Sequence, residues 1–111
     1  MLVTDAMAVT GTKMESFELH GRTIYRRDGR LTTADGTLAG SDLDMAGAVR
    51  NSVQRLSLAL PDVLRMASLI PARFLRLDHE LGRIAPGYRA DLVLLDESLQ
   101  VRQTWIGGQN N

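Results

Sequence analysis

The stretch around which the sequence is organised is Leu2-Val3-Thr4-Asp5-Ala6-Met7. A short apolar run delivers an acidic residue at its end, and the small residue that follows cannot crowd the carboxylate. In parallel β/α proteins, a carboxylate placed in this way lies at the C-terminal end of a strand, where active sites are built. The stretch therefore predicts a strand that ends on Asp5, which is either a catalytic carboxylate or simply a polar strand end.

Length and composition set the class of protein. The chain has 111 residues, 44% of them hydrophobic, enough for one modest domain with a core. Thirteen basic and thirteen acidic residues cancel, so no strong field favours nucleic acid or an anionic membrane. The absence of cysteine excludes disulfides and thiolate metal sites. With no apolar run near the roughly 20 residues of a membrane span and no basic leader, we expect a cytoplasmic protein.

A small antiparallel meander is predicted after the opening stretch. Residues 16–20 alternate between apolar and polar positions, residues 23–25 are β-prone, and residues 31–33 can form a return strand. Asp28-Gly29 is a hairpin turn signal. His20 lies on the polar side of the alternation, where we expect a solvated side chain. We expect the arginines around the turn to be solvated too, with an anion site as the alternative: Arg26, Arg27 and Arg30.

Helices and a second pair of strands are predicted in the rest of the chain. A helix is expected to start at Ser41, since Ser41 and Asp44 have capping-box spacing, and its apolar stripe comprises Met45, Val49, Val53, Leu56 and Leu60. Pro61 suits the first turn of a second helix. Pro71 ends or kinks that helix and can begin a short third one. Residues 90–96 read as a buried strand to which residues 101–106 pair antiparallel, and His79 is expected to be exposed.

Three stretches carry a resemblance to a known family: Leu2 to Met7, Asp35-Gly36-Thr37-Leu38-Ala39-Gly40-Ser41 running into Ala48-Val49-Arg50-Asn51, and Leu81-Gly82-Arg83-Ile84-Ala85-Pro86-Gly87 with Ala90-Asp91-Leu92-Val93-Leu94-Leu95-Asp96. Together they resemble the amidohydrolase superfamily and, within it, the N-acetylglucosamine-6-phosphate deacetylases. The resemblance covers nearly the whole chain. A small departure is Arg76, where the family pattern usually has a glycine.

The resemblance implies an α/β fold. The chain would be the C-terminal fragment of a metal-dependent (β/α)8 barrel with part of a small β-sandwich domain, and as an isolated chain it would be α+β. Residues 1–80 would form the end of the barrel, with Asp5 ending its eighth strand. Residues 81–111 would be the returning strands of the sandwich.

The resemblance also implies a reaction, the deacetylation of N-acetylglucosamine 6-phosphate to glucosamine 6-phosphate by metal-activated water. Asp5 would accept a proton from this water and later give one to the amine leaving group. Leu38, Ala39 and Gly40 match the family's substrate-contacting loop. Ser41 adjoins that loop and either caps the helix or contacts the amino-sugar phosphate.

The family's metal ligands, a glutamate and two histidines, lie on earlier strands, and His20 and His79 do not match them. The divalent ion (zinc, iron or similar) would therefore belong to the full-length enzyme. The resemblance places no metal ligand in this chain, although Asp5 would lie close to the metal ion. We expect the chain alone to bind no metal ion tightly and to be inactive.

An alternative from another class is a free-standing α+β interaction or dimerisation module without catalysis. In either case we expect self-association, because the helix stripe lacks the barrel on which it would pack.

Overall fold

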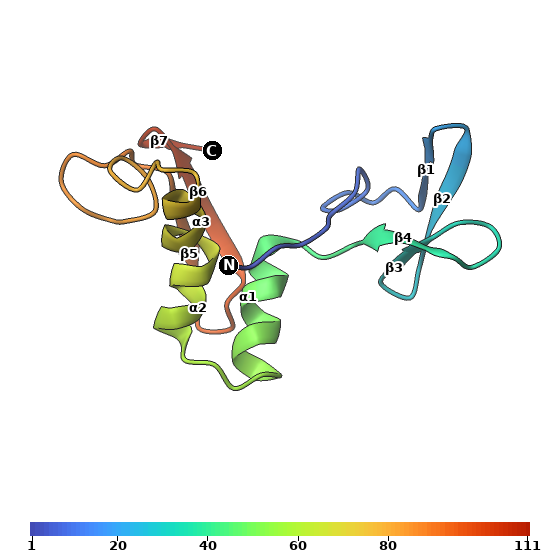
Figure 1. The fold of residues 1–111 in the computed structure, drawn as a ribbon, viewed down its shortest axis with the longest axis horizontal. Coiled ribbons are helices and arrows are strands. Elements are labelled where there is room, and N and C mark those ends of the chain that lie inside the picture. Colours follow the sequence, from blue (N-terminus) through green and yellow to red (C-terminus); the bar gives the residue numbers. More distant parts are fainter. The chain divides into compact units, whose positions relative to one another are not determined.

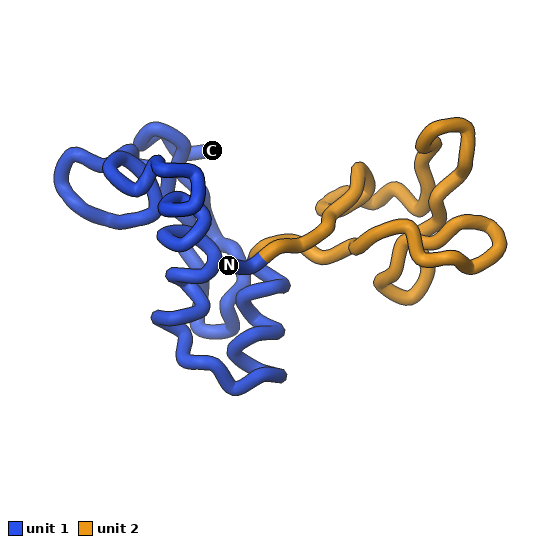
Figure 2. The backbone as a smooth tube through the Cα atoms, in the orientation of Figure 1, with its two compact units in different colours: residues 1–2, 46–111 blue, residues 3–45 orange.

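The computed structural model describes all 111 residues and divides into two compact units (Figure 2). Unit 1 comprises Met1–Leu2 and Ala46–Asn111, and unit 2 comprises Val3–Met45. Unit 2 is built on one sheet, whereas unit 1 combines helices with a second sheet. The chain is therefore α+β, as predicted for it in isolation. No helix is long and apolar enough to cross a membrane.

The sheet of unit 2 is an antiparallel meander in the order β1-β2-β3-β4 (Figure 1). Its strands are β1 (Ser16–Leu19), β2 (Arg22–Arg27), β3 (Arg30–Thr32) and β4 (Leu38–Ser41). The predicted meander is confirmed. The sequence does not predict the fourth strand, because residues 37–41 are mostly small, contain a glycine and show no alternation.

Two-residue turns connect the first three strands. Leu19 pairs with Arg22 across one turn, and Arg27 pairs with Arg30 across the other. Both central residues of each turn have positive φ, which is the type I′ geometry that matches strand twist. His20 (φ 48°) is therefore an exposed turn residue rather than the strand residue that the alternation predicted.

The core of unit 2 lies on one face of this meander. Val9, Ile24 and Leu31 are buried there. Partly buried hydrophobic residues pack around them, namely Met7, Phe17, Leu19 and Ala39. Since Val9 precedes the sheet in sequence, burial of its side chain holds the opening segment against the meander.

The opening stretch does not form the strand that its sequence predicted. Only Ala6 makes a β-bridge, parallel to Ser41, and residues 1–5 have no regular structure. Asp5 has φ 52°, which interrupts an extended conformation. A parallel strand also needs a neighbour along its length, and β4 provides one only at this single position.

Three helices follow: α1 (Met45–Gln54), α2 (Leu60–Ala67) and α3 (Leu69–Phe74). The predicted start at Ser41 is wrong, because Ser41 is the last residue of β4 and its hydroxyl accepts a hydrogen bond from the Leu43 N–H at 2.9 Å. Helix α1 instead starts directly after Asp44, a residue type favoured at the N-cap. Pro61 in the first turn of α2 and a short third helix around Pro71 are both confirmed.

The predicted apolar stripe is only partly a buried face. Helix α1 ends at Gln54, so the later stripe positions Leu56 and Leu60 belong to other segments, and Leu56 is exposed. The residues of α1 that are buried are mostly small: Gly47, Ala48, Val49 and Ser52. Of the stripe, Val49 alone is fully buried.

The second sheet has the order β5-β6-β7. Its strands are β5 (Leu92–Leu95), β6 (Val101–Ile106) and β7 (Gln109–Asn110). The antiparallel pairing of the first two is confirmed, and β7 was not predicted. The expectation that residues 90–96 are buried is wrong, because Val93 and Leu94 are exposed. The predicted division after residue 80, between the end of a barrel and a β-sandwich, stays a prediction.

The end of α3 explains why the family pattern has a glycine at the position of Arg76. Arg76 follows the C-cap residue Leu75 and has φ 59°. Its N–H donates to the Arg73 carbonyl at 3.0 Å, and the Leu77 N–H donates to the Ala72 carbonyl at 2.8 Å. These two bonds form a Schellman motif, in which the left-handed position is usually glycine. Arg76 therefore occupies a glycine position at a cost in backbone strain.

We expect the substitution Arg76→Gly to stabilise unit 1 by about 1 kcal/mol, because it removes the Cβ that disfavours the left-handed conformation. Arg76→Ala is the matched control, since it removes the side chain but keeps the Cβ, and it should leave stability nearly unchanged. Urea unfolding followed by helical circular dichroism measures both variants. Equal stability of the glycine and alanine variants would show that Arg76 is unstrained.

Candidate active site

The structure brings together the two parts of the site that the resemblance implied. The Ser41 N–H donates a hydrogen bond to the Asp5 carbonyl at 3.0 Å, and the next residue, Ala6, forms the parallel bridge to Ser41. Residues 36 positions apart in the sequence thus lie side by side through their backbones. Asp5 is fixed beside β4.

Gly40 permits this close approach. A Cβ built on Gly40 would lie 2.6 Å from the Met7 Cγ, closer still to the Met7 sulfur, and 3.4 Å from the Asp5 carbonyl oxygen. Gly40 is buried, and the Met7 side chain packs over it. A larger residue here would displace Met7 before it touched any ligand, so the glycine serves first to let the opening segment pack on β4.

The carboxylate of Asp5 is exposed and has neither a hydrogen bond nor an ion pair. Its backbone is held on both sides, since the Ala6 N–H donates to the Thr4 hydroxyl at 3.3 Å. Aspartate is one of the few residue types that tolerate its positive φ. Non-glycine residues in such conformations are concentrated at functional sites. The side chain is therefore free to act while its main chain is fixed.

The predicted substrate-contacting loop is a strand in this structure. Leu38 pairs with Thr32 and is 69% exposed, whereas Ala39 packs against the core beside a shift in strand register. Ser41 is half-buried at the end of β4. The four predicted residues thus form one continuous edge next to Asp5, with Leu38 as its exposed apolar side chain.

A rigid turn leads into this strand. One carboxylate oxygen of Asp35 accepts hydrogen bonds from the Thr33 hydroxyl at 2.5 Å and from the Thr37 N–H at 3.0 Å. The Thr33 hydroxyl and then the Thr37 backbone lower the pKa of Asp35 to about 2. Asp35 is therefore ionised at neutral pH and stabilises the turn, which is a structural use of this carboxylate rather than an acid–base one.

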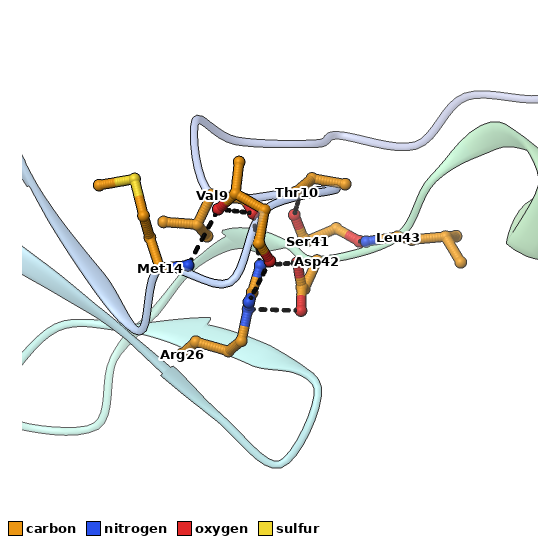
Figure 3. Close-up of polar contacts among 8 residues, drawn as sticks. Val9, Thr10, Met14, Arg26, Ser41, Asp42 and Leu43 are labelled. Atoms are coloured by element: carbon orange, nitrogen blue, oxygen red, sulfur yellow. Dashed lines mark hydrogen bonds and ion pairs between the residues drawn. The ribbon is translucent and has the colours of Figure 1, made fainter.

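Two residues near the site were missed by sequence reasoning. Arg26 and Asp42 form an ion pair next to the segment that follows Asp5 (Figure 3). The alternation of side chains along β2 indicates that Arg26 is not solvated, because Arg26 lies on the same face of the strand as buried Ile24. The expectation of a solvated arginine is therefore wrong for Arg26, while Arg27 and Arg30 are exposed.

No group of three or more histidine, cysteine, aspartate or glutamate side chains in the chain could hold a metal ion. His20 and His79 are both exposed. Asp5 alone does not make a site, since catalytic metal ions take about three protein ligands. The residues present therefore do not fit a catalytic metal centre by themselves.

A shallow groove lies away from these residues. It has a volume of about 400 Å³ and is lined by Arg22, Thr23, Tyr25, Thr33, Ala34 and Asp35. It contains none of the residues that converge on Asp5. The candidate site thus consists of Asp5 and β4, with the side chains of Asp5 and Leu38 exposed.

The chain is similar in sequence and in structure to known deacetylases. The model of the amidohydrolase family matches residues 19–110. The N-acetylgalactosamine-6-phosphate deacetylase of Escherichia coli O157:H7 is 43% identical over 98% of the chain, and the N-acetylglucosamine-6-phosphate deacetylase of Haemophilus influenzae is 34% identical over 97%. The crystal structure of N-acetylglucosamine-6-phosphate deacetylase from Pasteurella multocida superimposes on 98% of the chain with a TM-score of 0.92 and 37% identity.

The chain is much shorter than most of these proteins. It spans 29% of the length of both curated relatives and 29% of the crystallised chain. It spans 65% of a shorter relative from Escherichia coli K12, to which it is 43% identical. More than two thirds of the longer relatives thus has no counterpart in these 111 residues.

Proposed function

Because the chain belongs to the amidohydrolase family, we propose that it is the C-terminal part of a metal-dependent deacetylase that acts on N-acetylglucosamine 6-phosphate. The observation that carries the proposal is the backbone contact between Asp5 and Ser41, which holds a free carboxylate beside the strand that matches the substrate-contacting segment. In the longer protein, residues 1–80 would complete a (β/α)8 barrel and residues 81–111 a small β-sandwich.

Asp5 is the proposed general base and acid. Its carboxylate takes a proton from a water molecule, and the oxygen of that water attacks the acetyl carbonyl carbon. When the C–N bond breaks, the same carboxyl returns the proton to the nitrogen, which leaves as an amine, and acetate is the other product. An exposed, unpaired carboxylate on a fixed backbone suits both transfers, because no existing partner must be displaced.

The strand β4 is the proposed substrate-binding edge. Leu38 offers an exposed apolar surface to a sugar, and the small residues Ala39, Gly40 and Ser41 let the segment at Asp5 lie close against the strand. The structure of the Mycobacterium smegmatis deacetylase in complex with N-acetyl-D-glucosamine-6-phosphate has the same fold over 97% of this chain, at 34% identity. This likeness supports an amino-sugar phosphate as the substrate class.

The galactosamine epimer is a second candidate substrate. Relatives named for N-acetylgalactosamine 6-phosphate are 43% and 41% identical to the chain, compared with 34% and 35% for two bacterial relatives named for the glucosamine compound. The two sugars differ only in the configuration at C4, so the same chemistry at the acetamido group serves both.

The metal centre has to come from polypeptide outside these residues, since the chain contains no set of ligands. A divalent ion such as zinc or iron is proposed for the complete enzyme on the strength of the family. In consequence, the purified 111-residue chain should show no metal-dependent turnover.

A chimera tests the proposal directly. Residues 1–111 replace the matched segment of the Escherichia coli O157:H7 deacetylase, and acetate release is measured with both N-acetylhexosamine 6-phosphates in the presence of a divalent metal. Activity of the chimera without activity of the isolated chain is the expected result. An inactive but folded chimera would contradict the assignment, and turnover by the isolated chain would contradict the need for outside ligands.

In the active chimera, Asp5→Asn should lower kcat by roughly 10² to 10⁴, the usual contribution of general acid–base catalysis. KM should change little, because the amide keeps the shape of the side chain and loses only its basicity. The matched control is Asp28→Asn, which removes an exposed carboxylate of the same unit in the β2–β3 turn and should leave kcat unchanged. Near-normal kcat in Asp5→Asn would contradict the proposed catalytic role of Asp5.

The alternative function, an interaction or dimerisation module, is supported by apolar exposure in unit 1. Ile84 is 89% exposed and Phe74 is 75% exposed. The predicted apolar stripe on α1 supports self-association less than expected, because its residue Val49 is buried within the unit. The exposed residues of α3 and the following loop take its place as the proposed apolar surface.

We expect sedimentation velocity at micromolar concentration to detect self-association of the purified chain, since exposed apolar surface favours it. The double variant Phe74→Ser/Ile84→Ser should shift the distribution towards the monomer. A monomer at all concentrations tested would remove this expectation and leave only the enzymatic proposal.

A further inference from the structure

Arg26 is a charged residue on the apolar face of the meander. It lies two residues from buried Ile24 on β2 and pairs across the sheet with fully buried Leu31. The side chains of Arg26 and Asp42 are only 21% and 17% exposed. A charge placed among apolar neighbours costs free energy unless it is paired and hydrogen-bonded, so these partners matter.

The guanidinium of Arg26 joins three segments of unit 2 (Figure 3). Its Nη2 donates to one oxygen of Asp42 at 2.9 Å, and its Nε lies 2.8 Å from the other oxygen as a charge contact without hydrogen-bond geometry. The same Nη2 donates to the Val9 carbonyl at 2.5 Å, and Nη1 donates to the Thr12 carbonyl at 2.9 Å. Strand β2, the turn at residues 9–12 and the residue after β4 are thereby tied to one side chain.

The segment held in this way is the one that starts at Asp5. At its beginning, the Asp5 carbonyl accepts the Ser41 N–H, and in its middle the Thr10 hydroxyl donates to the Ser41 carbonyl at 3.3 Å. Arg26 and Asp42 hold its far end. Residues 5–12 thus run along residues 41–42 with contacts at both ends, which fixes the direction of the backbone at Asp5.

We propose that Arg26 and Asp42 are positioning residues for Asp5, acting through the turn at residues 9–12. The catalytic part of this inference rests on the proposed role of Asp5, whereas the backbone restraint is a property of the chain itself. Without the guanidinium, the Thr12 carbonyl and the Asp42 carboxylate lose their donor, and the Val9 carbonyl keeps only the donors of Thr12. The segment then stays anchored at its start, at Thr10 and through the Val9 side chain, but its far end is released.

Hydrogen exchange of the full 111-residue chain, followed by NMR, tests the restraint. In Arg26→Lys the charge remains, but the planar fork that serves Asp42 and two carbonyls is lost. The two probes are the Ser41 amide, bonded to the Asp5 carbonyl, and the Thr12 amide, which donates to the Val9 carbonyl at 2.9 Å. We expect both to exchange about tenfold faster, the order expected when hydrogen bonds to a charged group are lost. The Thr33 amide, which donates to the Thr37 carbonyl in the same unit, is the reference and should stay within twofold.

Arg27→Lys is the matched control, because Arg27 is the exposed neighbour of Arg26 and lies over the Tyr25 ring on the other face. It should leave the Ser41 amide unchanged. If Arg26→Lys does not fold, Asp42→Asn removes only the charge of the partner and should raise the same two exchange rates. An unchanged Ser41 amide, or an equal rise at Ser41 and Thr33, would overturn the proposal, the latter because Arg26 would then stabilise the sheet as a whole.

The same variants in the active chimera test the link to catalysis. Arg26→Lys should lower kcat while KM stays within about twofold, as expected for loss of a transition-state interaction, and Arg27→Lys should change neither. Equal kcat for Arg26→Lys and the parent chimera would overturn the positioning role. A parent chimera without activity would instead refute the proposed function, and the exchange experiment would still decide the restraint.

Discussion

The hydrogen bond from the Ser41 N–H to the Asp5 carbonyl is the contact on which the candidate site depends. A single such bond contributes only about 1 kcal/mol net, too little to order a segment that has no regular structure. Other contacts of the same segment supply the remaining stabilisation. Met7 covers Gly40, Val9 enters the core, and Arg26 donates to the carbonyls of the following turn. The site is therefore a product of tertiary packing around one short backbone contact.

The sequence predicts the parts of this fold that depend on local chemistry. The β1–β2–β3 meander follows from alternation and from two turns whose residues adopt positive φ, as the Asp28-Gly29 signal indicated. Strand β4 could not be predicted, because its small residues show no periodicity and its partners are set by tertiary contacts. The start of α1 was misplaced for a related reason: the backbone of Ser41 is used by β3 and Asp5, so the helix begins after Asp44.

The functional residues, too, depend on tertiary contacts that local sequence does not predict. That Asp5 lies beside Gly40 and Ser41 followed only from the resemblance, since nothing local links positions so far apart. Arg26 and Asp42 escaped prediction because Arg26 sits in a cluster of arginines that reads as a solvated turn, and only the alternation of β2 shows that it faces the core. For Arg76 the sequence showed only a departure from the family pattern, and the structure adds that the residue occupies a left-handed position.

The central claim, that Asp5 is fixed beside β4 by its backbone, can be measured without any variant. A scalar coupling across the hydrogen bond between the Ser41 amide nitrogen and the Asp5 carbonyl carbon should be detectable by NMR in the isotopically labelled chain. The coupling should persist from neutral pH to mildly acidic conditions, since neither bonded group titrates. Absence of the coupling, together with a Ser41 amide that exchanges as fast as one in an unstructured peptide, would show that the opening segment is detached from β4.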